Sequence, residues 1–410
     1  MYDVAVVGGG PGGLMSAIVS AKLGLDVVLL EKSRAFGYPV HDSGATPYST
    51  IEEFEIGTKV IAQEINGASF VSPSGRVVSG FLEKRGGCIL ERQKLNKELA
   101  KKASNAGVDI LLPANVTSPM IQNGKVDGLK FNSLSGHDDI KARLVIDASG
   151  ISSVLARKVG LHPGVDKIRL GYGAQYEESN VDLDFPTFLE FYFGNKVAPG
   201  GYGWIFPKGE DTAYVGVAIT QGDAKKAQQC LKYFVRNHVV SSDRLRNAQP
   251  LEFHSGILPV GPILDRFVYD GLMVVGDAAC QASPLFGEGI RYALKAGKIA
   301  GEVAVEALED GDTSRKKLEK FERRVRKEIW PNYSLLYKIH LYECSRKDED
   351  FEKLLDELEK MFQSDSGRRF LIKLIRSEIT KWDITKVGFR FLLKVLVGAR
   401  KLRTAHQRET

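Results

Sequence analysis

Residues 3 to 13 read Asp-Val-Ala-Val-Val-Gly-Gly-Gly-Pro-Gly-Gly, an apolar run that passes directly into five glycines around a proline. Gly8, Gly10 and Gly13 have the GxGxxG spacing of a turn between a buried strand and a helix. The first glycine allows the tight turn, the second lets a pyrophosphate approach the backbone, and the third lets the helix close on the sheet. Together with Gly12 in the same turn, they predict a dinucleotide-binding unit of the Rossmann type.

The second strand of this unit is predicted at residues 26–31, and it ends in an acidic side chain. Glu31 stands 18 residues after Gly13, where a carboxylate can accept the two ribose hydroxyls of an adenine dinucleotide. Lys32, the next residue, joins the predicted cofactor site. The alternative is a glycine-rich turn that is followed by an incidental acid.

The composition is that of a soluble globular protein. With 410 residues, 43% hydrophobic and 26% charged, the chain suffices for two to three domains and is not of a disordered, collagen-like or disulfide-scaffold type. Glycines interrupt the uncharged run 4–21, and neither a basic leader nor a cleavage site accompanies it, so we expect a cytoplasmic location. The four cysteines are scattered without a CxxC pair, which favours reduced thiols and no metal site.

Hydrophobic periodicity divides the chain. Short runs rich in Val, Ile and Leu predict a parallel sheet that is buried on both faces. From about residue 169 to 254 the pattern has a period of two, which predicts an inserted antiparallel sheet with strands at 187–193 and 212–220. After residue 311 the pattern is helical, with breaks at Pro331 and at 363–367. The parallel strands are expected at residues 3–7, 26–31, 142–148 and 271–276.

The basic charge of the chain is local. Residues 311–410 hold 25 Lys and Arg against 16 Asp and Glu, whereas residues 1–310 are slightly acidic. The pattern near the C-terminus predicts a basic helix with one apolar face, which favours peripheral contact with an anionic membrane. The alternative is that the apolar face of this helix packs on its own domain. No nucleic-acid-binding motif accompanies the charge, so we expect no nucleic acid partner. The stripe of this predicted helix carries Lys386, Arg390, Lys394 and Lys401.

A second block, about 260 residues after the first, favours FAD over NAD. In Gly271-Leu-Met-Val-Val-Gly-Asp-Ala-Ala279 a strand delivers Asp277, and Pro284-Leu-Phe-Gly-Glu-Gly-Ile290 turns into a helix. The pair resembles the p-hydroxybenzoate-hydroxylase-type flavoproteins, in which the first segment meets the ribityl chain and the helix N-terminus faces the flavin. Such a terminus stabilises negative charge on a reduced isoalloxazine. The resemblance implies FAD contacts at Asp277, Pro284, Gly287, Gly289 and Ile290.

Two further matches extend this resemblance. Arg92, which opens the helix predicted at 93–105, resembles the arginine that reaches the FAD phosphates and ribityl oxygens; the alternative is a surface residue. Val116 resembles the position whose backbone contacts adenine. No second GxGxxG unit follows in the sequence, so we expect FAD as the cofactor and no dedicated NAD(P) domain.

The predicted fold class is α/β with an α+β insertion. A Rossmann-type FAD-binding domain with a parallel sheet occupies residues 1–160, with a small substrate-side excursion at about 55–85, and resumes at 263–310. An antiparallel-sheet substrate domain is inserted at 161–262. A helical C-terminal region follows at 311–410.

The inserted sheet carries the segment Tyr-Gly-Trp-Ile-Phe-Pro, in which Tyr202, Trp204 and Phe206 occupy alternate positions. This segment is similar to the YxWxFP pattern of the geranylgeranyl reductase family, and with the FAD blocks the resemblance covers about residues 1–310. Aromatic side chains on one face of a sheet beside a flavin form a dry slot that suits an isoprenoid chain. Phe191 joins these three as a predicted substrate-binding residue. The alternative is that Trp204 and Phe206 only fill the core between the sheet and the helices, and that Phe191 is core or tunnel wall.

One position departs from that family. Where the resemblance implies a cysteine beside the flavin, this chain has Asp42, preceded by His41. A carboxylate can donate or relay a proton, or can hydrogen-bond the flavin, so Asp42 and His41 are the candidate catalytic residues. Asp42, Ser43 and Gly44 are also predicted cofactor contacts. The alternative is that Asp42 and His41 cap the loop.

The resemblance implies an FAD-dependent reductase of double bonds in the geranylgeranyl chains of archaeal-type membrane lipids. Electrons would come from a diffusible donor: reduced ferredoxin, NAD(P)H or a deazaflavin. Glu288 stands where many reductases of the family have glycine. With Asp42, this departure leaves the identity of the substrate undecided between several classes. The alternatives are a flavin monooxygenase of a small apolar or aromatic substrate, a membrane-docked electron-transfer flavoprotein, and a flavin-dependent isoprenoid cyclase with Asp42 or Glu288 as acid. Scattered cysteines argue against the iron–sulfur motif of the electron-transfer class.

Overall fold

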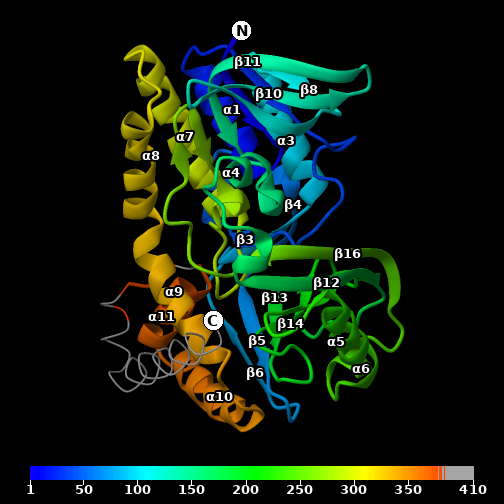
Figure 1. Ribbon diagram of the computed structural model, residues 1–410. Helices are drawn as coiled ribbons and strands as arrows, with labels where there is room; N and C mark the ends of the chain where they lie inside the picture. Colours follow the sequence, from blue (N-terminus) through cyan, green and yellow to red (C-terminus); the bar gives the residue numbers. More distant parts are fainter. Residues whose placement is uncertain (377, 381–382, 384–410) are drawn as a thin grey trace.

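The computed structural model describes residues 1–376, 378–380 and 383, and its first layer is a mostly parallel sheet near the top of Figure 1. The strand order is β17-β18-β11-β1-β2-β8, and each neighbouring pair is parallel except β17–β18. The predicted parallel sheet is therefore confirmed. Its strands are β1 (Tyr2–Val7), β2 (Val27–Leu30), β8 (Asp109–Leu111), β11 (Gly136–Asp147), β17 (Val268–Tyr269) and β18 (Leu272–Val274).

Helices and a hairpin layer bury this sheet. Helix α1 (Pro11–Lys22) packs against both α3 (Arg92–Asn105) and α7 (Ile290–Glu309). Residues Val4 to Val7 of β1 are all buried, which explains why they are apolar at consecutive positions. Strand β11 begins six residues before the predicted strand because its first half pairs antiparallel with β10 (Lys125–Ser133), which in turn pairs with β9 (Asn115–Gln122).

The second layer is a seven-stranded sheet in the order β16-β12-β15-β14-β13-β5-β6, shown in green and blue below the first in Figure 1. Its neighbouring pairs are antiparallel except β13–β5, which is parallel. The predicted excursion thus supplies two strands to the inserted sheet. Its strands are β5 (Gly67–Val71), β6 (Val77–Phe81), β12 (Leu170–Ser179), β13 (Phe188–Tyr192), β14 (Tyr202–Pro207), β15 (Ala213–Ile219) and β16 (Gln249–Pro259).

The two faces of the second sheet have different neighbours. Ile205 lies in a cluster with Phe234 of α5 (Ala224–Asn237), a helix that the sequence analysis did not predict. Trp204 and Phe206, one position to either side, lie in another cluster with Leu355 of α10 (Asp348–Phe362). The alternation along β14 therefore sorts its side chains to opposite faces, as a period of two requires. A small antiparallel sheet of β3 (Ala45–Pro47), β7 (Gly87–Leu90) and β4 (Ile61–Ile65) connects the layers.

The C-terminal region is helical as far as the structure describes it. It contains α8 (Arg315–Glu328), α9 (Trp330–Glu343), α10 and α11 (Asp365–Ile375), and the expected breaks fall at the α8–α9 and α10–α11 junctions. The predicted basic stripe Lys386, Arg390, Lys394 and Lys401 lies outside the described residues. Within the described ranges, no helix is both long and apolar enough to cross a membrane. The remaining short helices are α2 (Ser49–Glu53), α4 (Val154–Lys158) and α6 (Ser241–Arg244).

Candidate active site

The glycine turn between β1 and α1 forms a cradle that only glycine allows. Gly8 has a φ of +102°, and a Cβ there would lie 2.4 Å from the Ala148 carbonyl oxygen. A Cβ on Gly13 would lie 2.0 Å from the Gly8 carbonyl oxygen, so the helix start touches the strand end. Around Gly10, by contrast, no atom of the described residues lies within 4 Å of such a Cβ. The turn is therefore closed at Gly8 and Gly13 and open at Gly10, where α1 presents its N-terminal N–H groups to an anion.

The end of β2 holds this turn in place. Glu31 Oε2 accepts a hydrogen bond from the Gly9 amide at 2.6 Å, and Oε1 accepts one from the Ser33 amide at 2.7 Å. Each carboxylate oxygen has a further lone pair for a ribose hydroxyl. Lys32 is exposed beside it.

A polar network connects the cradle to the Asp42 loop. Arg92 Nε donates to Asp42 Oδ2 at 2.9 Å, and the Gly44 amide donates to Asp42 Oδ1 at 2.8 Å. Asn96, one turn along α3, accepts from Arg92 Nη1 at 3.2 Å and donates to the Gly9 carbonyl oxygen at 3.0 Å. Both Asp42 oxygens thus accept hydrogen bonds, and the guanidinium is fixed beside the glycine turn.

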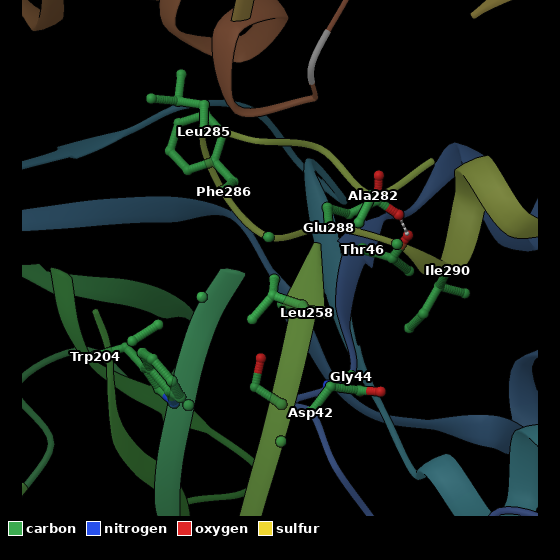
Figure 2. A pocket seen from close by; sticks show the side chains of 18 of the residues that line it. Asp42, Gly44, Thr46, Trp204, Leu258, Ala282, Leu285, Phe286, Glu288 and Ile290 are labelled. Atoms are coloured by element: carbon green, nitrogen blue, oxygen red, sulfur yellow. Dashed lines mark hydrogen bonds between the residues drawn. The ribbon is translucent and has the colours of Figure 1, made fainter. Parts of the chain in front are cut away.

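A cavity of about 360 Å³ lies between the two sheets and brings the cofactor and substrate predictions together. Figure 2 shows part of its wall, with Asp42 and Trp204 near Leu258 of β16. The predicted residues on its lining are Gly10, Gly12, His41, Asp42, Ser43, Gly44, Arg92, Phe191, Tyr202, Trp204, Phe206, Asp277, Pro284, Gly287, Gly289 and Ile290.

Five predicted residues do not line this cavity. Gly8, Gly13, Glu31 and Lys32 belong to the cradle or its support. Val116 is 5% exposed on β9 and opposite Phe131 of β10, so its side chain belongs to the core.

The first acidic group at the cavity is Asp277, which follows β18. Burial and, to a lesser extent, the charge of Asp42 raise the pKa of Asp277 to about 6, with Arg92 acting in the opposite direction. A Cβ on Gly289 would lie 3.6 Å from Asp277 Oδ1, so this carboxyl faces the turn that leads into α7.

Glu288, in that turn, is a second acidic group. Its Oε1 accepts from the Arg291 amide at 2.8 Å and from Thr46 Oγ1 at 3.5 Å, the contact drawn in Figure 2. Burial raises the pKa of Glu288, and Arg291 opposes that shift. The sequence analysis gave this residue a role only in the cyclase alternative, as a candidate acid.

The substrate-side wall is aromatic. Trp204 is 8% exposed and Phe206 and Phe191 are each 3% exposed, with the two phenyl rings 5.3 Å apart in an edge-to-face contact. Tyr202 donates its hydroxyl to the Phe286 carbonyl oxygen at 2.6 Å and so joins β14 to the turn before α7. These rings are core residues that also line the cavity.

His41 and two unpredicted residues complete the polar side. His41 is exposed at the cavity, and its Nδ1 donates to the Ser255 carbonyl oxygen at 3.0 Å. Gln175 Nε2 contacts the Asp42 carbonyl oxygen at 3.1 Å and His254 Nδ1 at 3.0 Å. Gln175 and His254 are opposite each other on β12 and β16, a pairing with no local sequence signal. Asn96 did have a signal, because it lies four residues after Arg92 on the same helix face.

These features fit FAD. An open Gly10 at a helix N-terminus suits a pyrophosphate, and Glu31 suits a ribose. Arg92 is joined to the same glycine turn through Asn96. Gly10 and Gly12 of the cradle line the same cavity as the aromatic wall, so a flavin bound there can face an apolar substrate.

Comparisons with known proteins agree with this geometry. Residues 170–258 match the family model of the geranylgeranyl reductase catalytic domain, and residues 3–161 match that of FAD dependent oxidoreductases. The chain is 37% identical to a digeranylgeranylglycerophospholipid reductase of Methanocaldococcus jannaschii over 92% of this chain and 95% of that protein. A reductase of the same name from Methanosarcina acetivorans is 36% identical, over 88% and 89%. The crystal structure of a geranylgeranyl bacteriochlorophyll reductase-like protein from Thermoplasma acidophilum superimposes with a TM-score of 0.83 at 31% identity, covering 94% and 95%.

Proposed function

This chain belongs to the geranylgeranyl reductase family of FAD-dependent oxidoreductases, and we propose that it reduces carbon–carbon double bonds in the geranylgeranyl chains of archaeal-type membrane lipids. The observation that supports this most directly is the continuity of one cavity, lined by Gly10 and Asp277 on the cofactor side and by Trp204 and Phe206 on the other. An apolar, aromatic wall there favours an isoprenoid chain over a polar metabolite.

The cofactor-binding residues are proposed from their places around the cradle. Gly10, Gly12 and the N-terminus of α1 bind the pyrophosphate, with Gly8 and Gly13 shaping the turn. Glu31, with Lys32 beside it, binds the adenosine ribose, and the backbone of Val116 contacts adenine. The residues on the flavin side are Asp42, Ser43, Gly44, Arg92, Asp277, Pro284, Gly287, Gly289 and Ile290.

Reduced FAD supplies the hydride, and the residues of this chain supply the rest. Phe191, Trp204 and Phe206 align the prenyl chain and exclude water from the reacting bond. Asp42 holds Arg92 in place beside the cradle, because both its oxygens are engaged in hydrogen bonds. His41, at the exposed end of the cavity, hydrogen-bonds β16 and keeps the Asp42 loop against the substrate sheet.

Electrons reach the flavin from a diffusible donor in this proposal: reduced ferredoxin, NAD(P)H or a deazaflavin. Peripheral contact with the membrane through the basic C-terminal segment would give the site access to its lipid.

The function is tested without oxygen. Protein reconstituted with FAD and reduced with dithionite is mixed with digeranylgeranylglyceryl phospholipid, and the lipid is analysed by mass spectrometry. We expect mass gains in steps of two hydrogens. A gain of one oxygen when air is admitted would instead show a monooxygenase, and a rearranged lipid of unchanged mass would show a cyclase. No mass gain with any prenyl lipid contradicts the proposal.

A further inference from the structure

We propose that Glu288 is the acid that delivers the proton to the second alkene carbon during reduction. This inference rests on the proposed function, since it assigns a residue to that reaction. It is carried by the position of the Glu288 side chain on the cavity wall and by the incomplete hydrogen bonding of its carboxyl group.

The Glu288 carboxyl is held on one side only. Its side chain is 9% exposed, and Oε1 accepts hydrogen bonds from the Arg291 amide and from Thr46 Oγ1. Oε2 is buried and has no hydrogen-bond partner among the described residues. A buried carboxylate oxygen without a donor is costly, and a proton on that oxygen lowers the cost because it removes the buried charge. The geometry therefore favours a carboxylic acid whose proton is on Oε2.

The surrounding charges leave this acid form in place. Arg291 Nε is 4.0 Å from Glu288 Oε2, beyond hydrogen-bond distance, while its Nη1 pairs with Glu378 at 2.9 Å and its Nη2 donates to the Arg376 carbonyl oxygen. The guanidinium charge is therefore shared with a second carboxylate. Asp42, across the cavity, adds negative charge that acts in the same direction as burial, and the pKa of Glu288 lies above its ordinary value.

The other acids at the cavity are less suited to this role. Both Asp42 oxygens accept hydrogen bonds, one of them from a guanidinium. Asp277 faces Asp42 and Arg92 on the cofactor side, at the end of β18. Tyr202 has its hydroxyl committed to the Phe286 carbonyl oxygen, and burial raises its pKa well above the ordinary value, so it is a poor proton donor. In Figure 2 Glu288 lies beside Thr46 on the wall that continues toward Leu285 and Phe286.

The step balances with groups that the proposal names. The two electrons of a hydride come from reduced flavin and form one C–H bond as the π bond breaks. The proton of Glu288 forms the second C–H bond, and Glu288 is left as a carboxylate. Water restores that proton before the next turnover.

The test uses three variants of the full-length, FAD-loaded protein. Glu288→Gln keeps the size and the acceptor atom but cannot act as an acid, Glu288→Asp keeps the acid, and Glu309→Gln removes an exposed carboxylate at the other end of α7 as a control. Each is examined by infrared spectroscopy in H₂O and D₂O for protonated carboxyl groups. Each is also examined by stopped-flow single turnover with geranylgeranyl lipid across a range of pH.

We expect the wild type to show a protonated carboxyl band at neutral pH that Glu288→Gln lacks and Glu309→Gln retains. Glu288→Gln should bind FAD and lipid normally yet slow the single turnover at least about a hundredfold. The wild-type rate should fall as pH rises through the raised pKa of Glu288, because the acid then loses its proton. Glu288→Asp should recover part of the rate and should shift the pH at which the rate falls.

Two results would overturn the assignment. One is a Glu288→Gln variant that turns over at the wild-type rate, and the other is an infrared band for protonated carboxyl groups that is the same in the wild type and in Glu288→Gln. If Glu288→Gln does not fold, an unshifted pH profile in Glu288→Asp overturns it and a shifted one supports it. Wild-type protein that reduces no prenyl lipid contradicts the proposed function instead, and the infrared bands then still report whether Glu288 holds a proton.

Discussion

Arg92 Nε lies 2.9 Å from Asp42 Oδ2, so an ion pair joins the first turn of α3 to the loop in which Asp42 stands in place of the expected cysteine. The Arg92 side chain is 11% exposed, whereas Asp42 is 45% exposed, so the guanidinium is the more buried partner. The pair places a positive charge beside the glycine cradle, where we propose that the diphosphate of FAD binds.

Arg92→Gln is therefore expected to weaken FAD binding about tenfold to a hundredfold, since a charge-assisted hydrogen bond contributes about 1.5 to 3 kcal/mol. The free energy of unfolding of the apoprotein should change by less than about 1 kcal/mol, because the partner is largely solvated. Equilibrium dialysis with FAD and urea unfolding measure the two quantities. Unchanged FAD affinity would remove Arg92 from the cofactor site.

Two glycine substitutions separate the cofactor from the fold. Gly10→Ala puts a methyl group into open space at the helix start and should weaken FAD binding at least about tenfold, with less than about 1 kcal/mol change in the unfolding free energy. Gly13→Ala puts it 2.0 Å from the Gly8 carbonyl oxygen and should cost about 1 to 3 kcal/mol of stability. Flavin titration and thermal melts of both apoproteins check this contrast. Equal loss of stability in the two variants would contradict it.

The raised pKa of Asp277 predicts a pH-dependent stability. Because the folded apoprotein holds this proton up to about pH 6 and the unfolded chain releases it near pH 4, stability falls as pH rises between these values. Asp277→Asn should remove that loss, so that at pH 7 the variant apoprotein is more stable by about 1 to 3 kcal/mol. The difference should vanish below about pH 4. Urea unfolding across this pH range measures the free energies of unfolding, with Asp265→Asn as a surface control. If the free energies of wild type and Asp277→Asn change with pH in the same way, the assignment is refuted.

The Tyr202 hydroxyl ties the aromatic strand to the turn before α7. Tyr202→Phe leaves the Phe286 carbonyl oxygen without this donor and should reduce the unfolding free energy by about 1 to 3 kcal/mol. Tyr38→Phe, at a side chain that is 57% exposed, should change it by less than about 0.5 kcal/mol. Chemical denaturation of both variants decides the point, and equal stabilities would show that the bond contributes nothing.

The features that could be predicted from sequence are those with local causes. The close approach of Gly13 to the Gly8 carbonyl oxygen follows from backbone geometry within the glycine turn, and the burial of Val4 to Val7 in β1 follows from their unbroken apolar run. The opposite faces of Ile205 and Trp204 follow from alternation along one strand.

The features that were missed depend on distant pairing. β5 joins β13 in parallel across more than a hundred residues, and Gln175 meets His254 because β12 and β16 pair in one particular register. No local pattern specifies either partner. Helix α5 was different, because Asp223 caps it and its buried residues Ala227, Cys230, Leu231 and Phe234 have helical spacing. This helix was not predicted because the stretches on both sides of it have a period of two, which led to the interpretation of the whole region as strands.

The central claim is tested most directly by counting electrons in a single anaerobic turnover. Enzyme-bound FAD is reduced by one equivalent of dithionite, geranylgeranyl lipid is added, and flavin absorbance and lipid mass are followed in the same sample. The account predicts that one double bond disappears for each flavin that regains its yellow absorbance, without oxygen. A flavin that stays reduced until air is admitted, with the lipid unchanged, would contradict it.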